Sequence, residues 1–437
     1  MVAFSVKRAS CVLIALFCLQ STTAFSQEFD EKELAMSQWI DAHAEESIAL
    51  LEELVNIDSG TMNPDGVRQV GKVLRRELDA LGLETKWIDF PPEINRAGHL
   101  VATQEGTKGP KILMIGHLDT VFEAEGPGFQ RDGNVATGPG VDDMKSGDVV
   151  MVYALKALQQ VGLLEGLPVV VFYTGDEEKP GEPLSVVRKD LIEAGKWADV
   201  ALGFESAAYD ENTDWATISR RSSSDWRLEV SGVQAHSSQV FSDEVGAGAI
   251  FEAARILDEF YDEVRGEKYL TFNAGTIQGG TDVLYDFEQN RGTTFGKTNV
   301  VARKTIVHGG IRALSPEQLE RAMDAMRAVV DRHLPHTDAA IEFEEGYPPM
   351  APTEGNIRLQ QELSAINEAL GRGPMPALDP SKRGAADISF VAPYVDGLAG
   401  MGAIGDGSHT PDENLQLDSM PLAVKRAAIL IYRLSIE

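Results

Sequence analysis

Apolar residues in the first half of this chain recur with two spacings, which predict helices and buried strands in alternation. Ile48, Leu51 and Leu54 follow the spacing of an amphipathic helix, and the segments 65–81 and 148–160 repeat it. Strands are predicted at 85–90, 100–103, 111–116, 167–173 and 200–204. The segment 167–173 is an unbroken apolar run, which is typical of a strand covered on both faces. The alternation predicts an α/β fold whose mostly parallel central sheet is flanked by helices.

The pattern changes near residue 216. Trp226, Leu228 and Val230 alternate with polar residues, which predicts a half-exposed strand. The elements expected after it are a helix at 247–261, strands at 269–274 and 299–307, a helix that a capping box at Ser315 opens and that ends near 333, and a strand at 340–344. This β-α-β-β-α-β order suits a small two-layer α+β domain inserted into the first one.

Helical spacing resumes at Asn356, and the chain closes with a helix predicted at 422–434. We therefore expect one domain in two parts, 27–215 and 347–437. The segment 216–346 is expected to be a second domain inserted between them.

The first 26 residues differ from the rest of the chain. Lys7 and Arg8 precede an apolar run at 11–19, and small residues follow at Ala24 and Ser26. This order of charged, apolar and small residues predicts a secretory signal peptide that is cleaved after Ser26. We expect a periplasmic or secreted protein that has no membrane association after cleavage.

Composition excludes several functional classes. The 437 residues, 43% hydrophobic and 24% charged, have the composition of an ordinary globular protein. A formal net charge of −29 would repel phosphates, so nucleic acid is not expected as a partner. Both cysteines, Cys11 and Cys18, lie in the predicted signal peptide, so the mature chain would have no disulfide and no thiolate nucleophile.

A glycine-rich turn at 138–147 carries Asp142 and Asp143 and then opens the helix predicted at 148–160. The strand before it, 111–116, ends beside His117 and Asp119. Open α/β sheets place their chemistry beyond the C-terminal ends of their strands. We therefore expect the functional site at this edge, with a turn aspartate that bridges two metal ions.

Other histidines and acids follow further strands or loops, and together they form a set of possible ligands: His117, Asp143, Glu178, Glu205 and His409. Mixed imidazole and carboxylate ligands suit zinc and, less tightly, cobalt or manganese. Asp119 lies two residues after His117, so in an extended chain it faces the same way and can accept the second ring N–H. A single such residue is usually a surface or capping residue, and the coincidence of five favours a metal site.

Glu177 and Glu178 are adjacent at the end of a predicted strand. Neighbouring side chains in an extended segment point in opposite directions, so both cannot easily bind one ion. One of them can bind metal while the other faces the attacking water. That free carboxylate would act as general base and later as acid to the leaving nitrogen.

These motifs resemble, in order and spacing, those of the zinc-dependent M20 peptidases, with the glutamate carboxypeptidase subgroup nearest. The matching stretches are His117-Leu-Asp119, the turn at 138–145, Asp176-Glu-Glu178, Glu205 and Gly-Ser-His409. The resemblance implies two Zn²⁺ per subunit: His117 and Glu205 on one, Glu178 and His409 on the other, and Asp143 on both. It selects Asp143 over Asp142, because the family's aspartate lies two residues before the lysine. It also makes Glu177 the base and implies a cis peptide bond between Asp143 and Met144.

The resemblance also makes 27–215 and 347–437 the catalytic domain and the inserted segment 216–346 a lid or dimerisation domain. It implies that His236 reaches an active site, often that of a partner subunit, and stabilises the oxyanion, which would make the protein a homodimer. Asn299 and Arg312 occupy the places of substrate-binding residues, and Arg312 would clamp a carboxylate. Arg221 and Arg383 are weaker candidates for the same task.

The sequence therefore predicts a secreted di-zinc carboxypeptidase that acts on a small peptide or N-acyl amino acid with a free carboxylate. An N-acyl amino acid deacylase or a dipeptidase would use the same site with a different pocket. A noncatalytic binding protein on the same fold is the third alternative. Gly384-Ala-Ala-Asp387 differs from the family's usual Gly-Gly-x-Asp, and the loop at Tyr347 lacks an arginine expected of a strict glutamate-specific enzyme. The released residue is therefore left unassigned.

Overall fold

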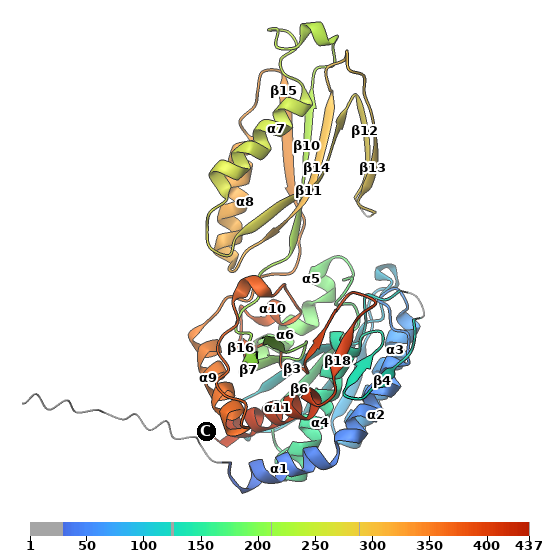
Figure 1. The fold of residues 1–437 in the computed structure, drawn as a ribbon, viewed down its shortest axis with the longest axis vertical. Coiled ribbons are helices and arrows are strands. Elements are labelled where there is room, and N and C mark those ends of the chain that lie inside the picture. Colours follow the sequence, from blue (N-terminus) through green and yellow to red (C-terminus); the bar gives the residue numbers. More distant parts are fainter. Residues whose placement is uncertain (1–28, 124–125, 211, 288, 437) are drawn as a thin grey trace, which may run out of the picture.

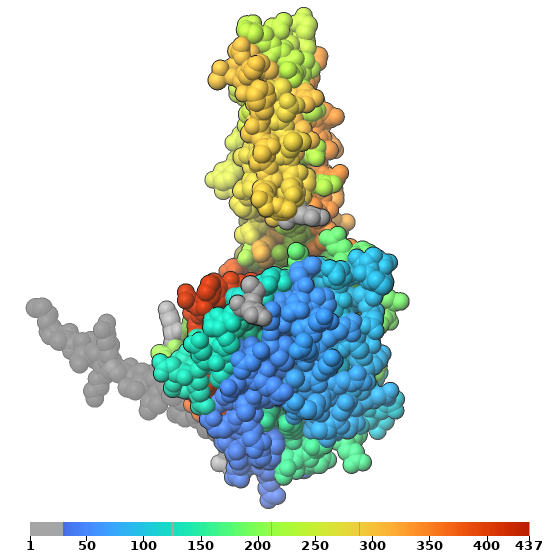
Figure 2. All heavy atoms as spheres, turned by 90° about the vertical axis from the view of Figure 1, so that its right-hand side faces the viewer, coloured from blue at the N-terminus to red at the C-terminus, as the bar shows by residue number. Residues whose placement is uncertain are grey.

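The computed structural model describes residues 29–123, 126–210, 212–287 and 289–436. The predicted signal peptide, 1–26, lies outside these residues. Two bodies are stacked along the long axis of the molecule (Figure 1). We call the larger one the main body and the smaller one, from Ser224 to Phe343, the lid. Figure 2 shows the lid as a narrow column that stands on the broader main body.

A six-stranded sheet forms the centre of the main body. In spatial order its strands are β1 (Glu84–Ile88), β2 (His99–Gln104), β6 (Val169–Thr174), β3 (Ile112–His117), β7 (Val200–Gly203) and β16 (Gly397–Leu398). The last four strands run parallel to one another. Strand β2 runs antiparallel to both of its neighbours, β1 and β6. The predicted fold class, α/β with a mostly parallel central sheet, is confirmed.

Helices cover both faces of this sheet, which explains the unbroken apolar runs in its strands. Ile112 and Met114 of β3 face one core, and Leu113 and Ile115 face the other. The first core is completed by α1 (Glu31–Ala42), α2 (Ala44–Val55), α3 (Pro64–Ala80), α4 (Ser146–Gln160), α9 (Glu354–Ala369) and α11 (Ser419–Ile436). The second core is completed by α5 (Leu184–Val187), α6 (Lys189–Trp197) and α10 (Ile388–Val391).

A small antiparallel sheet lies beside the central one. Its strands, in spatial order, are β17 (Gly405–Asp406), β18 (Asn414–Gln416), β5 (Val135–Thr137) and β4 (Gln130–Asp132). Because β5 pairs with β18, the turn after β5 and the loop before β18 are held together. These two segments are far apart in the sequence. The remaining short elements are η1 (Pro92–Ile94), β8 (Ala208–Asp210), β9 (Thr213–Trp215) and η5 (Pro380–Lys382).

The lid is an antiparallel sheet with two helices on one face (Figure 1). In spatial order its strands are β11 (Thr271–Gly280), β14 (Lys304–Arg312), β10 (Ser224–Gly232) and β15 (Thr337–Phe343). Its other elements are η3 (Ser237–Gln239), α7 (Ala249–Glu259), η4 (Phe260–Val264), the hairpin of β12 (Asp282–Asp286) with β13 (Arg291–Phe295), and α8 (Pro316–Val330). Trp226, Leu228 and Val230 point into its core, as their alternation predicts.

The strand predicted at 299–307 is displaced in the structure. Strand β14 begins at Lys304 and ends at Arg312. Residues before it pair with the loop after β10 instead: the N–H of Ser237 donates to Asn299 O at 2.9 Å, and that of Val301 donates to Ala235 O at 2.9 Å. Apolar side chains alone do not distinguish a strand from such a paired loop.

Two linkers join the lid to the main body, and they pair with each other. The backbones of Arg220 and Met350 exchange two hydrogen bonds of 2.9 Å. Ser223 and Tyr347 exchange two more, of 2.9 and 2.8 Å. We call residues 220–223 and 347–350 the hinge pair.

Among the residues described, no helix combines the length and the apolar character that crossing a membrane requires.

Candidate metal centre

The glycine-rich turn positions Asp143 through its backbone. Gly140 has φ 72°, a left-handed conformation that favours glycine, and η2 (Val141–Lys145) follows it. The bond between Asp143 and Met144 is cis, as the family resemblance implies. The buried carboxylate of Glu413 accepts three hydrogen bonds from this turn, from the N–H groups of Gly140 (3.1 Å), Asp142 (2.8 Å) and Asp143 (2.9 Å).

Four of the five predicted ligands converge at the end of β3. His117 Nε2 lies 3.2 Å from Asp143 Oδ1. On the other side, His409 Nε2 lies 3.1 Å from Asp143 Oδ2 and 3.2 Å from Glu178 Oε2. Ligand atoms of His117, Asp143 and Glu178 all lie within 4.8 Å of one another. Asp143 stands between the two imidazoles, which is the place a bridging carboxylate would take.

The donor atoms of this cluster fit divalent cations. Glu178 Oε1 is buried and has no hydrogen-bond partner, so one carboxylate oxygen is available at the centre. Imidazole nitrogen and carboxylate oxygen are the ligands that zinc takes in proteins. The three residues that gather most closely would therefore serve a metal ion through atoms that already face one another.

Asp119 does more than orient His117. His117 Nδ1 donates to the backbone carbonyl of Asp119 at 3.0 Å, while the Asp119 carboxylate lies 3.5 Å away. A carbonyl oxygen can only accept, so Nδ1 carries a proton and Nε2 faces the cluster. The carboxylate instead accepts from the N–H groups of Glu177 (2.9 Å) and Glu178 (3.1 Å) and from the Thr61 hydroxyl (2.6 Å).

Close contacts between acids and imidazoles shift the pKa values in the absence of bound ions. Hydrogen bonds to Asp143 and Glu178 raise the pKa of His409 to about 10. Burial raises the pKa of Glu178 to about 7, against the opposing effect of His409. Burial disfavours the charge on Asp143, yet hydrogen bonds from His117 and His409 lower its pKa overall. Hydrogen bonds between the imidazoles and the carboxylates thus hold the cluster together. A metal ion would displace the protons of these hydrogen bonds.

Glu177 has the environment of a proton-transfer group. Burial raises its pKa well above the ordinary value, and the charges of Glu205, Asp387 and Glu178 add to the rise. Its backbone N–H donates to Asp119, and its carbonyl accepts from the Tyr347 hydroxyl at 2.8 Å. A carboxylate with a raised pKa takes a proton more readily than an ordinary one and can later return it.

Glu205, the fifth predicted ligand, lies at the edge of the cluster. Its Oε2 forms an ion pair of 2.6 Å with Nη1 of Arg220, a buried residue of the hinge pair. The charge of Glu205 also contributes to the raised pKa of Glu177.

His236 and Asn299 lie at the far end of the lid. They adjoin each other, because His236 pairs with Val300 and the N–H of Ser237 donates to Asn299 O. The nine residues of β10 separate the hinge pair from this end, a span of about 30 Å for an extended strand. Within one subunit, the structure does not bring these two residues to the metal cluster.

Arg312 ends β14 at the opposite, hinge side of the lid. A Cβ atom on Gly384 would lie 3.4 Å from Arg312 Nη1, so the arginine borders the Gly384–Asp387 loop. Arg221 is nearby: burial and the charge of Arg312 lower its pKa. Arg383 donates to Ser206 O at 2.7 Å; burial and the charge of Arg220 lower its pKa, against the opposing charges of Glu205, Asp142 and Asp143. The two weaker candidates thus also lie on the hinge side of the site.

Two supporting residues were missed from the sequence. Glu413 holds the turn of Asp143, yet in sequence it is one acid in a polar loop, a pattern usually interpreted as solvated charge. Tyr347 holds the carbonyl of Glu177, whereas the sequence singled out its loop only for an arginine that it lacks. Neither contact has a signal in local spacing.

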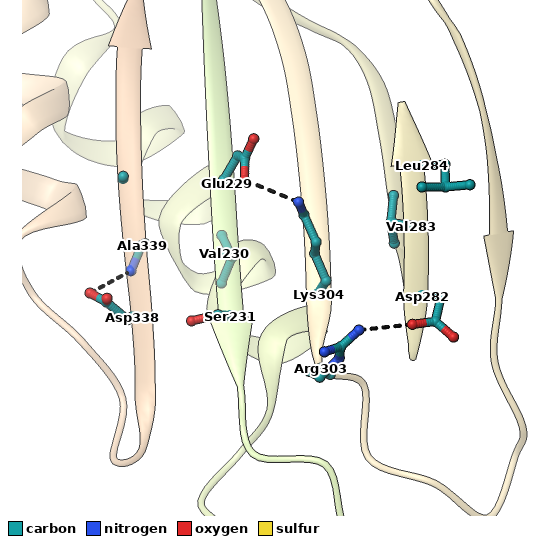
Figure 3. A pocket seen from close by; sticks show the side chains of 11 residues that line it. Glu229, Val230, Ser231, Asp282, Val283, Leu284, Arg303, Lys304, Asp338 and Ala339 are labelled. Carbon is teal, nitrogen blue, oxygen red and sulfur yellow. Dashed lines mark hydrogen bonds and ion pairs between the residues drawn. The ribbon is translucent and has the colours of Figure 1, made fainter. Parts of the chain in front are cut away.

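A separate cavity of about 550 Å³ opens on the lid (Figure 3). Glu229 pairs there with Lys304 at 3.1 Å and Arg303 with Asp282 at 2.8 Å, and Asp338 accepts from the N–H of Ala339 at 3.1 Å. The cavity contains none of the predicted site residues.

Comparisons with known proteins agree with this geometry. The sequence model of Peptidase family M20/M25/M40 matches residues 113–433. Carboxypeptidase G2 from Pseudomonas sp. (strain RS-16) is 26% identical over 396 residues, which cover 88% of this chain and 88% of that protein. A succinyl-diaminopimelate desuccinylase from Alkalilimnicola ehrlichii is 26% identical over 386 residues, which cover 85% of this chain and 94% of the relative.

Solved structures share the fold. The aminopeptidase PepT from Bacillus cereus superposes with a TM-score of 0.70 at 18% identity, covering 90% of this chain and 99% of that one. An M20 family metallo-carboxypeptidase from Sulfolobus solfataricus gives a TM-score of 0.65 at 16% identity, with 90% and 100% covered.

Proposed function

This chain belongs to peptidase family M20/M25/M40, and on that premise we propose that it is a di-zinc carboxypeptidase. Its substrate would be a small peptide or N-acyl amino acid with a free carboxylate. The observation that carries the proposal is the placement of Asp143 between His117 and His409, with Glu178 against His409 and Glu177 next in the chain. Cobalt or manganese could substitute for zinc in such a ligand set.

The residues divide the chemical work as follows. Divalent cations held by His117, Asp143, Glu178 and His409 would supply Lewis-acid polarisation of the scissile carbonyl and would lower the pKa of a water molecule. Glu177 takes the proton of the attacking water and later returns it to the leaving nitrogen. Arg312, which borders the loop after Arg383, would receive the substrate carboxylate in a bidentate contact. Asp119 keeps Glu177 and His117 in place.

A second copy of the chain would complete the site. His236 and Asn299 lie at the far end of the lid, so we propose that they serve the active site of a partner in a homodimer. The lid carries exposed apolar side chains that a partner could cover: Phe241 (66% exposed), Phe251 (55%), Ile250 (47%) and Ile277 (55%). Phe241 and Phe251 already stack edge to face at 5.3 Å. Exposed apolar clusters of this kind often mark protein interfaces.

We also propose that the protein acts in the periplasm or outside the cell. The support is the order of charged, apolar and small residues in 1–26.

A deacylase is the second candidate function. It is favoured by the similarity to a succinyl-diaminopimelate desuccinylase, which matches this chain at the same identity as carboxypeptidase G2. The metal centre and Glu177 would be the same in both reactions, and only the pocket for the acyl group would differ. A noncatalytic binding protein would have no need of Glu177 in its buried, pKa-raised position.

The test is a panel of dipeptides and N-acyl amino acids with varied C-terminal residues, assayed with the zinc-loaded and the chelated protein. We expect hydrolysis that needs metal and a free substrate carboxylate. Glu177→Gln should keep its zinc and lose about 10³-fold or more in turnover. Glu193→Gln, at an exposed site, is the matched control. Full activity of Glu177→Gln would overturn the assignment of the base.

A further inference from the structure

The backbone of Glu177 is held from both sides by different parts of the fold. Its N–H donates to Asp119 Oδ1 at 2.9 Å, and its carbonyl accepts from the Tyr347 hydroxyl at 2.8 Å. The side chain leaves the Cα atom between these two groups. Fixing both of them therefore fixes the direction of the Cα–Cβ bond, from which the Glu177 side chain starts.

The Tyr347 hydroxyl has only one way to make this contact. Arg188 Nη2 lies 2.8 Å from the same hydroxyl oxygen, and a guanidinium can only donate. The oxygen accepts from Arg188, so the single proton of the hydroxyl is left for the carbonyl of Glu177. The ring is also packed, edge to face, against Phe390 at 4.8 Å.

Arg188 is itself immobilised by buried carboxylates. It is fully buried and pairs with Asp176 at 2.7 Å and with Asp387 at 2.8 Å. Asp387 also accepts from the Thr174 hydroxyl at the end of β6. Asp176 directly precedes Glu177, so the same network fixes the chain on the N-terminal side of the proposed base. Buried charges that are paired in this way are costly to disturb.

Tyr347 belongs to the hinge pair, whereas Glu177 belongs to the main body. The backbone of Tyr347 exchanges two hydrogen bonds with Ser223, the residue that precedes β10 of the lid. A rotation of the lid about these linkers would act directly on the residue that holds the Glu177 carbonyl. Domain closure around a ligand is commonly absorbed by a few linker residues of this kind.

We propose that Tyr347 is a positioning residue that ties the orientation of Glu177 to the hinge of the lid. The inference rests on the proposed function, because it takes Glu177 as the base. The hydrogen bond from the Tyr347 hydroxyl goes to the backbone carbonyl of Glu177 and not to its carboxylate. It acts through the Glu177 peptide group, so it should alter turnover more than substrate affinity.

The test compares zinc-loaded wild type with Tyr347→Phe, which keeps the ring and removes the hydroxyl. We expect kcat to fall about tenfold, the value of one well-placed hydrogen bond, with KM within about twofold of wild type. Zinc content should stay at the wild-type level. Tyr394→Phe, at an exposed tyrosine of the main body, is the matched control and should match wild type.

Hydrogen–deuterium exchange gives a readout that does not depend on activity. The amides of Glu177 and Glu178 donate to Asp119, so loosening the loop should speed exchange in the segment 176–182 of Tyr347→Phe. A purely structural tyrosine would lower Tm while kcat and this local exchange stay at the wild-type level, and that result would overturn the inference. If wild type hydrolyses none of the panel, the proposed function fails, and exchange still decides whether Tyr347 holds the loop.

Discussion

The carboxylate of Asp119 accepts a hydrogen bond from the backbone N–H of Glu177 at 2.9 Å. Asp119 lies just beyond the end of β3, and Glu177 lies just beyond the end of β6, the neighbouring parallel strand. The contact joins two strand ends and sets the proposed base beside His117, whose Nδ1 is held by the carbonyl of the same aspartate. One acid thus positions the predicted ligand His117 through its backbone and the proposed base through its side chain.

Replacing Asp119 with asparagine should show whether its role is to position Glu177 or to support metal binding. The amide group offers one acceptor oxygen, so one of the two N–H groups, of Glu177 or Glu178, would face an NH₂ group instead. We expect turnover to fall about 10- to 100-fold, the range typical of supporting residues in metal sites. Steady-state kinetics and zinc titration would measure the effect. Asp89→Asn, at an exposed acid, is the control, and equal turnover in both variants would contradict the prediction.

Glu413→Gln should weaken metal binding and lower stability together. The substitution removes an acceptor from a buried carboxylate that holds three N–H groups of the turn around Asp143. A buried N–H left without a partner costs about 1–3 kcal/mol, so the free energy of unfolding should fall by that amount. Urea denaturation and zinc titration provide the two measurements. The neighbouring exposed Asp412→Asn should leave both unchanged, and a normal zinc affinity in Glu413→Gln would refute the role.

Zinc affinity should rise with pH. Without metal, His409 has a pKa of about 10 and Glu178 one of about 7, so both hold protons near neutral pH that a metal must displace. A raised pKa means stronger competition by protons, and raising the pH removes that competition. We expect affinity to increase about tenfold per pH unit for each proton released between pH 6 and 9. Calorimetry in buffers of different ionisation enthalpy would count these protons, and a pH-independent affinity would contradict the scheme.

Complementation would test whether His236 acts across a dimer. Glu177→Gln and His236→Ala should each be inactive alone. In a mixed dimer, the subunit that keeps Glu177 would receive an intact His236 from its partner. With free exchange of subunits, about a quarter of wild-type activity should return. No recovery on mixing, with dimers verified by light scattering, would place His236 outside the partner's site.

The sequence alone determined the fold class and most of the metal cluster. Apolar runs in β3 and β6 are long enough to identify buried strands, because each strand is covered on both faces. His117 and Asp143 follow such signals directly, and the order of motifs identified Glu178 and His409. Local spacing can find these residues, because each of them lies at the end of a strand or in the segment that follows one.

Only the tertiary structure decided how the site is held and which residues share it. Glu413 and Tyr347 contact the turn of Asp143 and the carbonyl of Glu177 across 270 and 170 residues of sequence. The separation of His236 from the metal cluster depends on the direction of β10 relative to the hinge pair, and strand direction in space has no counterpart in residue spacing. Sequence patterns report which face of an element is apolar. Hydrogen bonds between distant segments form only after those faces have packed, so they were decided by the tertiary structure.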